Sequence, residues 1–236
     1  MQERPEVTLH FAQSLDGRIG YPLGQRLHLS SGDGLRLAHH ARASHDAVLV
    51  GVGTVLSDDP QLSVRHVAGP QPRRVVLDSS LRLPDTARML SGEGGPLTVF
   101  AVAGGAGVEA RAERLRARGV DVALTEADDA GRVCVHAALQ ALKRRGVATL
   151  LVEGGALTLT SFLKQRVADR VTIELLPFLV GEPALQAFGE VQGAARCLGA
   201  NVTLPELSIP RLDGAKMEEL DGSWLIRGRL VYGEAN

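Results

Sequence analysis

The chain is poor in aromatic residues and cysteines, and it has no excess of positive charge. Phe, Trp and Tyr make up 3% of its 236 residues, too few for the stacking platforms that bind single-stranded nucleic acid. The formal net charge is −1, so we expect no basic surface that would attract a nucleic-acid backbone. Cys134 and Cys197 are far apart and form no CxxC pair, which argues against a disulfide framework and a cysteine zinc site.

Long apolar runs and metal-ligand spacings are also missing. No apolar run reaches the ~18 residues that a membrane helix needs, and residues 1–6 are polar, without the apolar core of a signal peptide. The seven histidines show no HExxH spacing, and the adjacent His39 and His40 would point about 100° apart on a helix. We therefore expect a cytoplasmic, metal-free protein that associates with neither nucleic acid nor a membrane.

What remains is typical of an α/β protein. Hydrophobic residues make up 44% of the chain, enough for a sizeable core. Apolar runs alternate with segments of helical spacing through the first three quarters, whereas the tail alternates as strands. The predicted strands are residues 7–12, 47–51, 74–78, 97–103, 120–124, 147–152, 170–176, 202–207, 215–220 and 223–232. The predicted helices span about 33–44, 108–118 and 136–145, with another after Gly155. Since no linker or repeat interrupts the pattern, we expect one domain over residues 1–236.

The most informative stretch is residues 147–167, in which a buried strand leads through Glu153, Gly154 and Gly155 into a helix. Two glycines allow a ligand to approach the backbone closely, and the N–H groups at a helix start favour phosphate. In open α/β sheets the ligand crevice lies at the carboxyl ends of the strands, where Glu153 is placed. The alternative is an ordinary βα turn, with glycines for tight packing and a solvated Glu153.

Three connecting segments have simple interpretations. The loop at 19–26, which contains Gly20, Pro22 and Gly24, is either a mobile lid or an ordinary connector. Asp58 and Asp59 precede Pro60, a pattern typical of a turn. Asp221-Gly222 lies between two predicted strands and predicts a hairpin with a type I′ turn.

Several motifs in chain order resemble one enzyme family. They are Ser14-Leu-Asp-Gly17, His40-Ala-Arg42-Ala, the run from Val48 to Arg65 (Val-Leu-Val-Gly-Val-Gly-Thr-Val-Leu-Ser-Asp-Asp-Pro-Gln-Leu-Ser-Val-Arg), Val75-Val-Leu-Asp-Ser79, Val152-Glu-Gly-Gly155 and Pro177-x-x-x-Gly181. This set is similar to the reductase domain of riboflavin biosynthesis, the 5-amino-6-(5-phosphoribosylamino)uracil reductase family. The resemblance covers about residues 7–233. It implies a dihydrofolate-reductase-like α/β fold, with a mostly parallel central sheet, flanking helices and antiparallel C-terminal strands.

The resemblance also implies a reaction and its participants. The enzyme would be a homodimer that uses NADPH, opens the ribosylamine to an imine and delivers hydride to the ribose C1′. The cofactor would contact Ala12, His28, Thr54, Asp58, Ser79, Gly155, Ala156, Leu157, Thr158, Leu159, Thr160 and Ser161. The phosphorylated substrate would contact Arg26, Arg42, Leu62, Arg65 and Glu153. The bacterial bifunctional enzymes carry a zinc deaminase domain with HxE and PCxxC motifs, which this sequence lacks, so we expect a reductase domain alone.

The chemistry of these side chains agrees with the implied roles. Arg42 and Arg65 could hold a sugar phosphate bidentately, and Glu153 could accept N–H groups of a uracil edge. Asp58 is the candidate donor or relay of the required proton; alternatively it only binds cofactor and water supplies the proton. Arg82 could hold a 2′-phosphate, although that idea does not come from the family. We expect Thr54, Glu153 and Arg65 to share one cavity.

Two other functions remain open. One is NADPH-dependent reduction of a pterin or dihydrofolate-like heterocycle, because Asp33 lies about where an acid would contact a pterin. A carboxylate at that helix start is explained by the helix dipole, and we prefer this interpretation. The other is a non-catalytic nucleotide-binding protein.

Overall fold

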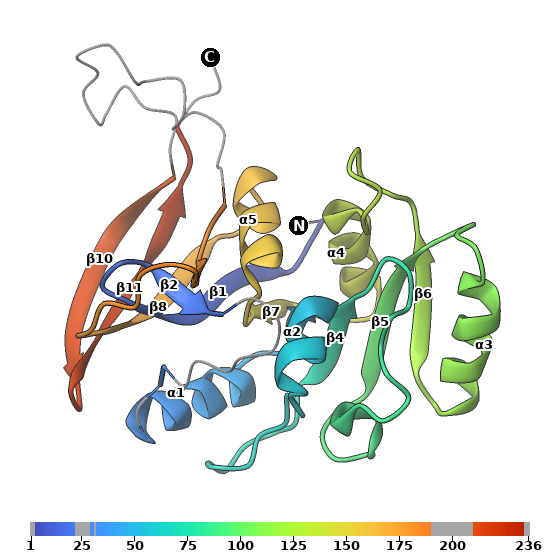
Figure 1. Cartoon of the computed structure of the whole chain (residues 1–236), viewed down its shortest axis with the longest axis horizontal. Coiled ribbons are helices and arrows are strands. Elements are labelled where there is room, and N and C mark those ends of the chain that lie inside the picture. Colours follow the sequence, from blue (N-terminus) through green and yellow to red (C-terminus); the bar gives the residue numbers. More distant parts are fainter. Residues whose placement is uncertain (1–2, 22–28, 31, 190–209, 234–236) are drawn as a thin grey trace.

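A computed structural model describes residues 3–21, 29–30, 32–189 and 210–233, and within them most strands belong to one sheet. The strand order of that sheet is β10-β11-β8-β1-β7-β3-β4-β5-β6 (Figure 1). In chain order its strands are β1 (Glu6–Ser14), β3 (Ala47–Gly51), β4 (Arg73–Leu77), β5 (Leu97–Val102), β6 (Asp121–Thr125), β7 (Thr149–Val152), β8 (Arg170–Leu176), β10 (Arg211–Leu220) and β11 (Ser223–Val231). The strand predicted at 202–207 lies outside the described residues.

The central strands run parallel and the C-terminal ones antiparallel, as predicted. β1 pairs in parallel with both β7 and β8, and β3 pairs in parallel with β7 and β4. β11 is antiparallel to β8 and β10. The inner strands are continuous apolar runs because helices cover both faces of the sheet, as is usual for parallel strands.

The helices cover the two faces in separate groups (Figure 1). They are α1 (Gly32–Ala43), α2 (Val52–Asp58), α3 (Val108–Ala117), α4 (Val135–Arg144) and α5 (Ala156–Lys164), with a 3₁₀ turn, η1 (Arg88–Leu90). Leu49 of β3 points to the face that α4 and α5 cover, where it shares a core with Phe162. Val48 and Val50 point to the opposite face and share a core with Val55 of α2. Among the residues that the structure describes, none of the helices combines the length and apolar character needed to cross a bilayer.

Three local predictions differ from the structure. Residues 52–58 form α2, which was not predicted; Asp58 ends the helix and Asp59 follows in a left-handed conformation with φ 43°. The loop predicted at 19–26 begins inside a short strand, β2 (Arg18–Gly20), which pairs with β9 (Leu185–Gln186); residues 22–26 lie outside the described ranges. The hairpin at Asp221-Gly222 is present, but its predicted type I′ turn is wrong, because only Gly222 has a positive φ, of 78°.

Candidate active site

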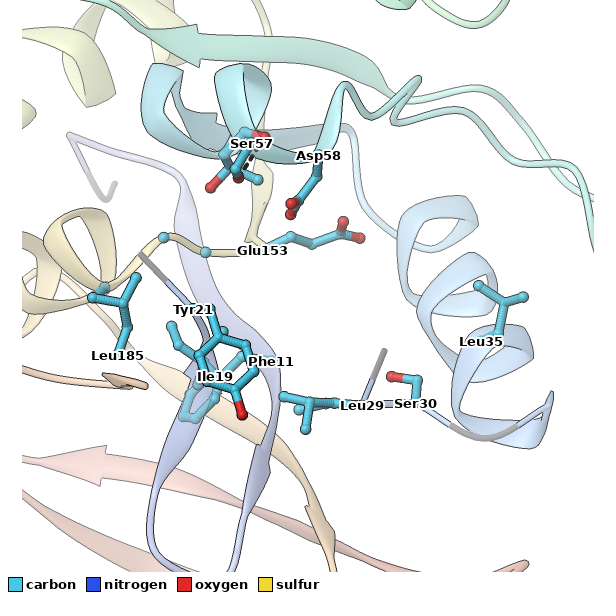
Figure 2. Close-up of a pocket in the computed structure, with 16 residues that line it drawn as sticks. Phe11, Ile19, Tyr21, Leu29, Ser30, Leu35, Ser57, Asp58, Glu153 and Leu185 are labelled. Atoms are coloured by element: carbon cyan, nitrogen blue, oxygen red, sulfur yellow. Dashed lines mark hydrogen bonds between the residues drawn. The ribbon is translucent and has the colours of Figure 1, made fainter. Parts of the chain in front are cut away.

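A cavity of about 470 Å³ opens at the carboxyl ends of β1 and β7, beside α2 and α5 (Figure 2). Its place matches the ligand crevice of open α/β sheets. One wall is apolar and is formed by Phe11, Ile19, Tyr21, Leu29 and Leu185. Figure 2 shows this wall on the opposite side of the cavity from the polar residues Ser57, Asp58 and Glu153.

The turn between β7 and α5 requires its two glycines. Gly154 and Gly155 have φ values of 118° and 83°, a region that side chains with a Cβ rarely adopt. A Cβ on Gly155 would lie 2.9 Å from Oγ1 of Thr54, so α2 and the start of α5 approach each other closely here. Gly155 also provides no side-chain cap for α5, which leaves the first N–H groups of the helix available to an anion. This cradle fits the phosphate portion of a dinucleotide.

Glu153 is the polar group that the structure fixes most firmly in the cavity wall. Nε and Nη2 of Arg42 donate hydrogen bonds to its two carboxylate oxygens, both at 2.7 Å. The two side chains are 13% and 10% exposed, so the pair is largely shielded from water. Burial raises the pKa of Glu153, but the charge and hydrogen bonds of Arg42 outweigh burial and lower it. Glu153 is therefore an ionised hydrogen-bond acceptor.

Arg42 also connects Glu153 to the segment that carries Arg65. Nη1 of Arg42 donates to the carbonyl of Ser63 at 3.2 Å, and Nη1 of Arg65 donates to Oγ of Ser63 at 2.6 Å. Arg65 is exposed overall, but partial desolvation of its guanidinium and the nearby Arg42 cation lower its pKa. Two neighbouring guanidinium groups favour the binding of an anion at their solvent-facing side. Of the three residues expected to share a cavity, Thr54 and Glu153 line it and Arg65 does not.

A buried histidine lies beneath this segment. His39 on α1 is fully buried, and its Nδ1 accepts a hydrogen bond from the backbone N–H of Arg65 at 3.0 Å. Burial, followed by the charges of Arg42, His66 and Arg65, lowers the pKa of His39 to about 4. His39 is neutral near pH 7, as an acceptor at Nδ1 must be.

The residues predicted for the cofactor fall into three groups. Those that line the cavity are Ala12, Thr54, Asp58, Gly155 and Ala156. The rest of α5 does not line it: Thr158, Leu159 and Thr160 are buried, Ser161 is half-buried, and Leu157 is exposed. Ser79 lies elsewhere, where its Oγ accepts a hydrogen bond from the N–H of Val133 at 3.0 Å. His28 lies outside the described residues.

The predicted substrate residues separate in a similar way. Glu153 lines the cavity, whereas Arg42 does not line it and donates hydrogen bonds to Glu153. Leu62 is buried next to Ser63 in a left-handed conformation with φ 55°. Arg26 lies outside the described residues. Arg82 lines a separate cavity of about 420 Å³ together with Arg111 and Arg114.

The apolar wall was not identified from the sequence. Ile19 and Tyr21 belong to the segment interpreted as a lid or connector, and Leu185 belongs to a two-residue strand. Single apolar residues in short connecting segments carry no pattern that distinguishes a cavity wall from ordinary packing. Within the described ranges, the structure shows no group of three or more His, Cys, Asp or Glu side chains that could hold a metal ion.

Comparisons with known proteins place the chain in a family. The sequence model of the RibD C-terminal domain matches residues 5–218. The riboflavin biosynthesis protein RibD of Aquifex aeolicus is 38% identical over 182 residues, which cover 77% of this chain and 49% of that protein. The 2,5-diamino-6-ribosylamino-4(3H)-pyrimidinone 5′-phosphate reductase of Archaeoglobus fulgidus is 37% identical over 188 residues, which cover 75% of this chain and 83% of the relative.

A solved structure supports the same relationship. RibD of Acinetobacter baumannii superposes with a TM-score of 0.77 at 26% identity, covering 98% of this chain and 59% of the other. The chain thus spans about half the length of the Aquifex aeolicus RibD protein and most of the length of the Archaeoglobus fulgidus reductase. The predicted dihydrofolate-reductase-like fold is confirmed. On the match over residues 5–218 and these identities, the chain belongs to the RibD C-terminal domain family.

Proposed function

We propose that this protein is an NADPH-dependent reductase of riboflavin biosynthesis, which reduces the ribosyl group of 5-amino-6-(5-phosphoribosylamino)uracil to ribityl. The observation that carries the proposal is the Arg42–Glu153 pair in the cavity wall, next to the Gly154-Gly155 turn. It combines an ionised acceptor for a pyrimidine edge with a cradle for a dinucleotide. The names of relatives support the same class of substrate, a pyrimidine that carries a ribose phosphate.

Each end of the substrate has a matching group on the protein. The carboxylate of Glu153, held by Arg42, accepts N–H groups of the pyrimidine ring. Arg65, which is exposed and contacts Ser63 as Arg42 does, holds the sugar phosphate where the substrate extends beyond the cavity. These two contacts orient the ribose, and orientation accounts for much of the rate increase that a reductase needs from its protein.

Proton transfer is assigned to Asp58, the last residue of α2. Figure 2 shows Asp58 and Glu153 on the same side of the cavity. Both carboxylate oxygens of Glu153 accept hydrogen bonds from Arg42, which keeps Glu153 ionised. Asp58 is therefore the carboxyl group of this wall that can donate or relay a proton to the substrate. NADPH, when bound, supplies the hydride. Thr54 and the Gly155 end of α5 would hold it, and the apolar wall would limit the access of water to the reacting atoms.

The pterin alternative is less well supported by the geometry. Asp33, the acid on which that alternative depends, is exposed at the start of α1 and is not among the described residues that line the cavity. A carboxylate in the first turn of a helix is explained by the helix dipole alone. No comparable observation favours a non-catalytic nucleotide-binding protein.

An assay of NADPH oxidation tests the proposal. The purified protein should oxidise NADPH when 5-amino-6-(5-phosphoribosylamino)uracil is added, and it should not respond to dihydrofolate. The diamino-pyrimidinone analogue named for the Archaeoglobus fulgidus relative is the second substrate to try. Turnover of dihydrofolate in place of either ribose phosphate would contradict the proposal. The homodimer, the cytoplasmic location and the single domain over residues 1–236 stay predictions, and light scattering of the purified protein tests the first.

A further inference from the structure

Three side chains, two from α1 and one from the loop before β4, hold the backbone of residues 63–65. Nη1 of Arg42 donates to the carbonyl of Ser63, as described above. The side-chain amide of Gln71 accepts from the N–H of Val64 and donates to its carbonyl, both at 2.8 Å. His39 accepts from the N–H of Arg65 at 3.0 Å. The segment belongs to no helix or strand, so these side-chain hydrogen bonds fix the backbone position from which the Arg65 side chain extends.

His39 is the member of this set that contacts Arg65 directly. It lies one helical turn before Arg42 on α1, and residues at that spacing share one face of a helix. A single helix therefore fixes both the backbone of Arg65 and the guanidinium that orients Glu153. This arrangement fixes the position of the proposed phosphate contact relative to the proposed pyrimidine contact.

Stability alone does not explain a histidine at this position. Nε2 of His39 is buried and, in the part of the chain that the structure describes, has no hydrogen-bond partner. With Nδ1 acting as acceptor, Nε2 carries the proton, and a buried N–H without a partner destabilises the fold. The His39 ring packs edge-on against the ring of His66, with centroids 4.5 Å apart, a contact that another ring could also make. The acceptor at Nδ1 is what distinguishes histidine here.

We propose that His39 is a positioning residue for substrate binding, which fixes the backbone of Arg65 so that its guanidinium meets the substrate phosphate while Glu153 holds the pyrimidine. The inference rests on the proposed function, because it takes Arg65 as the phosphate ligand. His39 itself touches neither substrate nor cofactor.

Three variants separate positioning from general packing. His39→Leu removes the acceptor and keeps an apolar side chain, whereas His39→Asn retains an acceptor oxygen close to the place of Nδ1. His40→Leu is the matched control, because His40 is the next residue of α1 and is exposed. His39→Leu should raise KM for the phosphorylated substrate roughly tenfold, with kcat and KM for NADPH little changed. His39→Asn should recover most of the loss, and His40→Leu should match the wild type.

A double-mutant cycle tests whether His39 acts through Arg65. In an Arg65→Ala background, His39→Leu should have no further effect on KM for the phosphorylated substrate. The same fold increase in both backgrounds would overturn the inference. If His39→Leu does not fold, His39→Phe replaces it in the cycle, because it removes the acceptor and keeps a ring against His66.

Amide hydrogen exchange tests the contact without any turnover. The Arg65 amide should exchange faster in His39→Leu than in the wild type, and His39→Asn should restore its protection. Unchanged exchange in His39→Leu would overturn the inference. If the wild type turns over no ribose phosphate, the proposed function fails on its own, while the exchange result still decides whether His39 holds Arg65.

Discussion

Arg42 and Glu153, which are 111 residues apart in the sequence, meet in a two-pronged ion pair beside the cavity. Both side chains are largely buried, so removal of one partner leaves the other as an uncompensated charge. The pair therefore links the stability of the protein to the geometry of the proposed substrate site, and both can be measured in one variant.

Glu153→Gln should destabilise the protein and weaken substrate binding together. Loss of one partner of a buried pair costs about 3 kcal/mol of unfolding free energy, which urea denaturation measures. Glu218→Gln is the matched control, since Glu218 pairs with Arg227 at 3.6 Å on the surface, where a pair contributes about 1 kcal/mol or less. Equal losses in the two variants would show that the Arg42–Glu153 pair has no special role in stability.

Arg65→Ala should affect the phosphorylated substrate and spare the cofactor. Loss of a charge-assisted hydrogen-bonded contact of ~1.5–3 kcal/mol raises KM for the substrate roughly 10- to 100-fold. KM for NADPH should barely change. Arg144→Ala, at an exposed position of α4 on the other face of the sheet, provides the comparison. Equal damage to both Michaelis constants in Arg65→Ala would mean that Arg65 is wrongly assigned.

Gly155→Ala should weaken cofactor binding. The added Cβ would lie 2.9 Å from Oγ1 of Thr54, at the place where the dinucleotide cradle forms. Gly146→Ala is the control, because Gly146 has nearly the same φ, 82° against 83°, and nothing lies within 4 Å of its added Cβ. Gly146→Ala should lose about 1 kcal/mol of stability through backbone strain, and Gly155→Ala should lose more because its Cβ also crowds Thr54. Only Gly155→Ala should lose NADPH affinity in a fluorescence titration; equal affinities in the two variants would place the cradle elsewhere.

Acid should destabilise the protein through His39. Its folded-state pKa is lowered from 6.5 to about 4, so between these values the unfolded chain binds a proton that the folded protein does not. The contribution of His39 is therefore complete above pH 6.5 and is lost as the pH falls toward 4. His39→Asn cannot titrate at this position, so the wild type should lose stability relative to His39→Asn as the pH falls through this window. Urea unfolding of both proteins at several pH values measures the difference in their unfolding free energies, and a difference that does not change with pH would contradict the account.

The sheet could be predicted from the sequence because parallel strands buried on both faces are continuous apolar runs. Residues 47–51 and 170–176 match β3 and β8 residue for residue. α2 was missed because it has only seven residues and ends at Asp58, the first residue of an Asp-Asp-Pro sequence that is typical of a turn. β2 and β9 are too short to show any periodicity.

The candidate site could be predicted in part. The Glu153-Gly154-Gly155 turn and its place at a strand end followed from the local sequence alone. The pairing of Arg42 with Glu153 did not, because no local pattern shows which side chains meet across 111 residues. The role of Arg42 as a phosphate ligand stays a prediction; the structure adds that three of its N–H groups donate to Glu153 and Ser63.

The most direct measurement follows NADPH oxidation by the wild type and by Glu153→Gln, with 5-amino-6-(5-phosphoribosylamino)uracil as substrate and dihydrofolate as the comparison. The account predicts turnover of the ribose phosphate by the wild type, a large loss of kcat/KM in the variant, and no response to dihydrofolate from either protein. Equal activity of the two proteins toward the ribose phosphate, or oxidation driven by dihydrofolate, would contradict it.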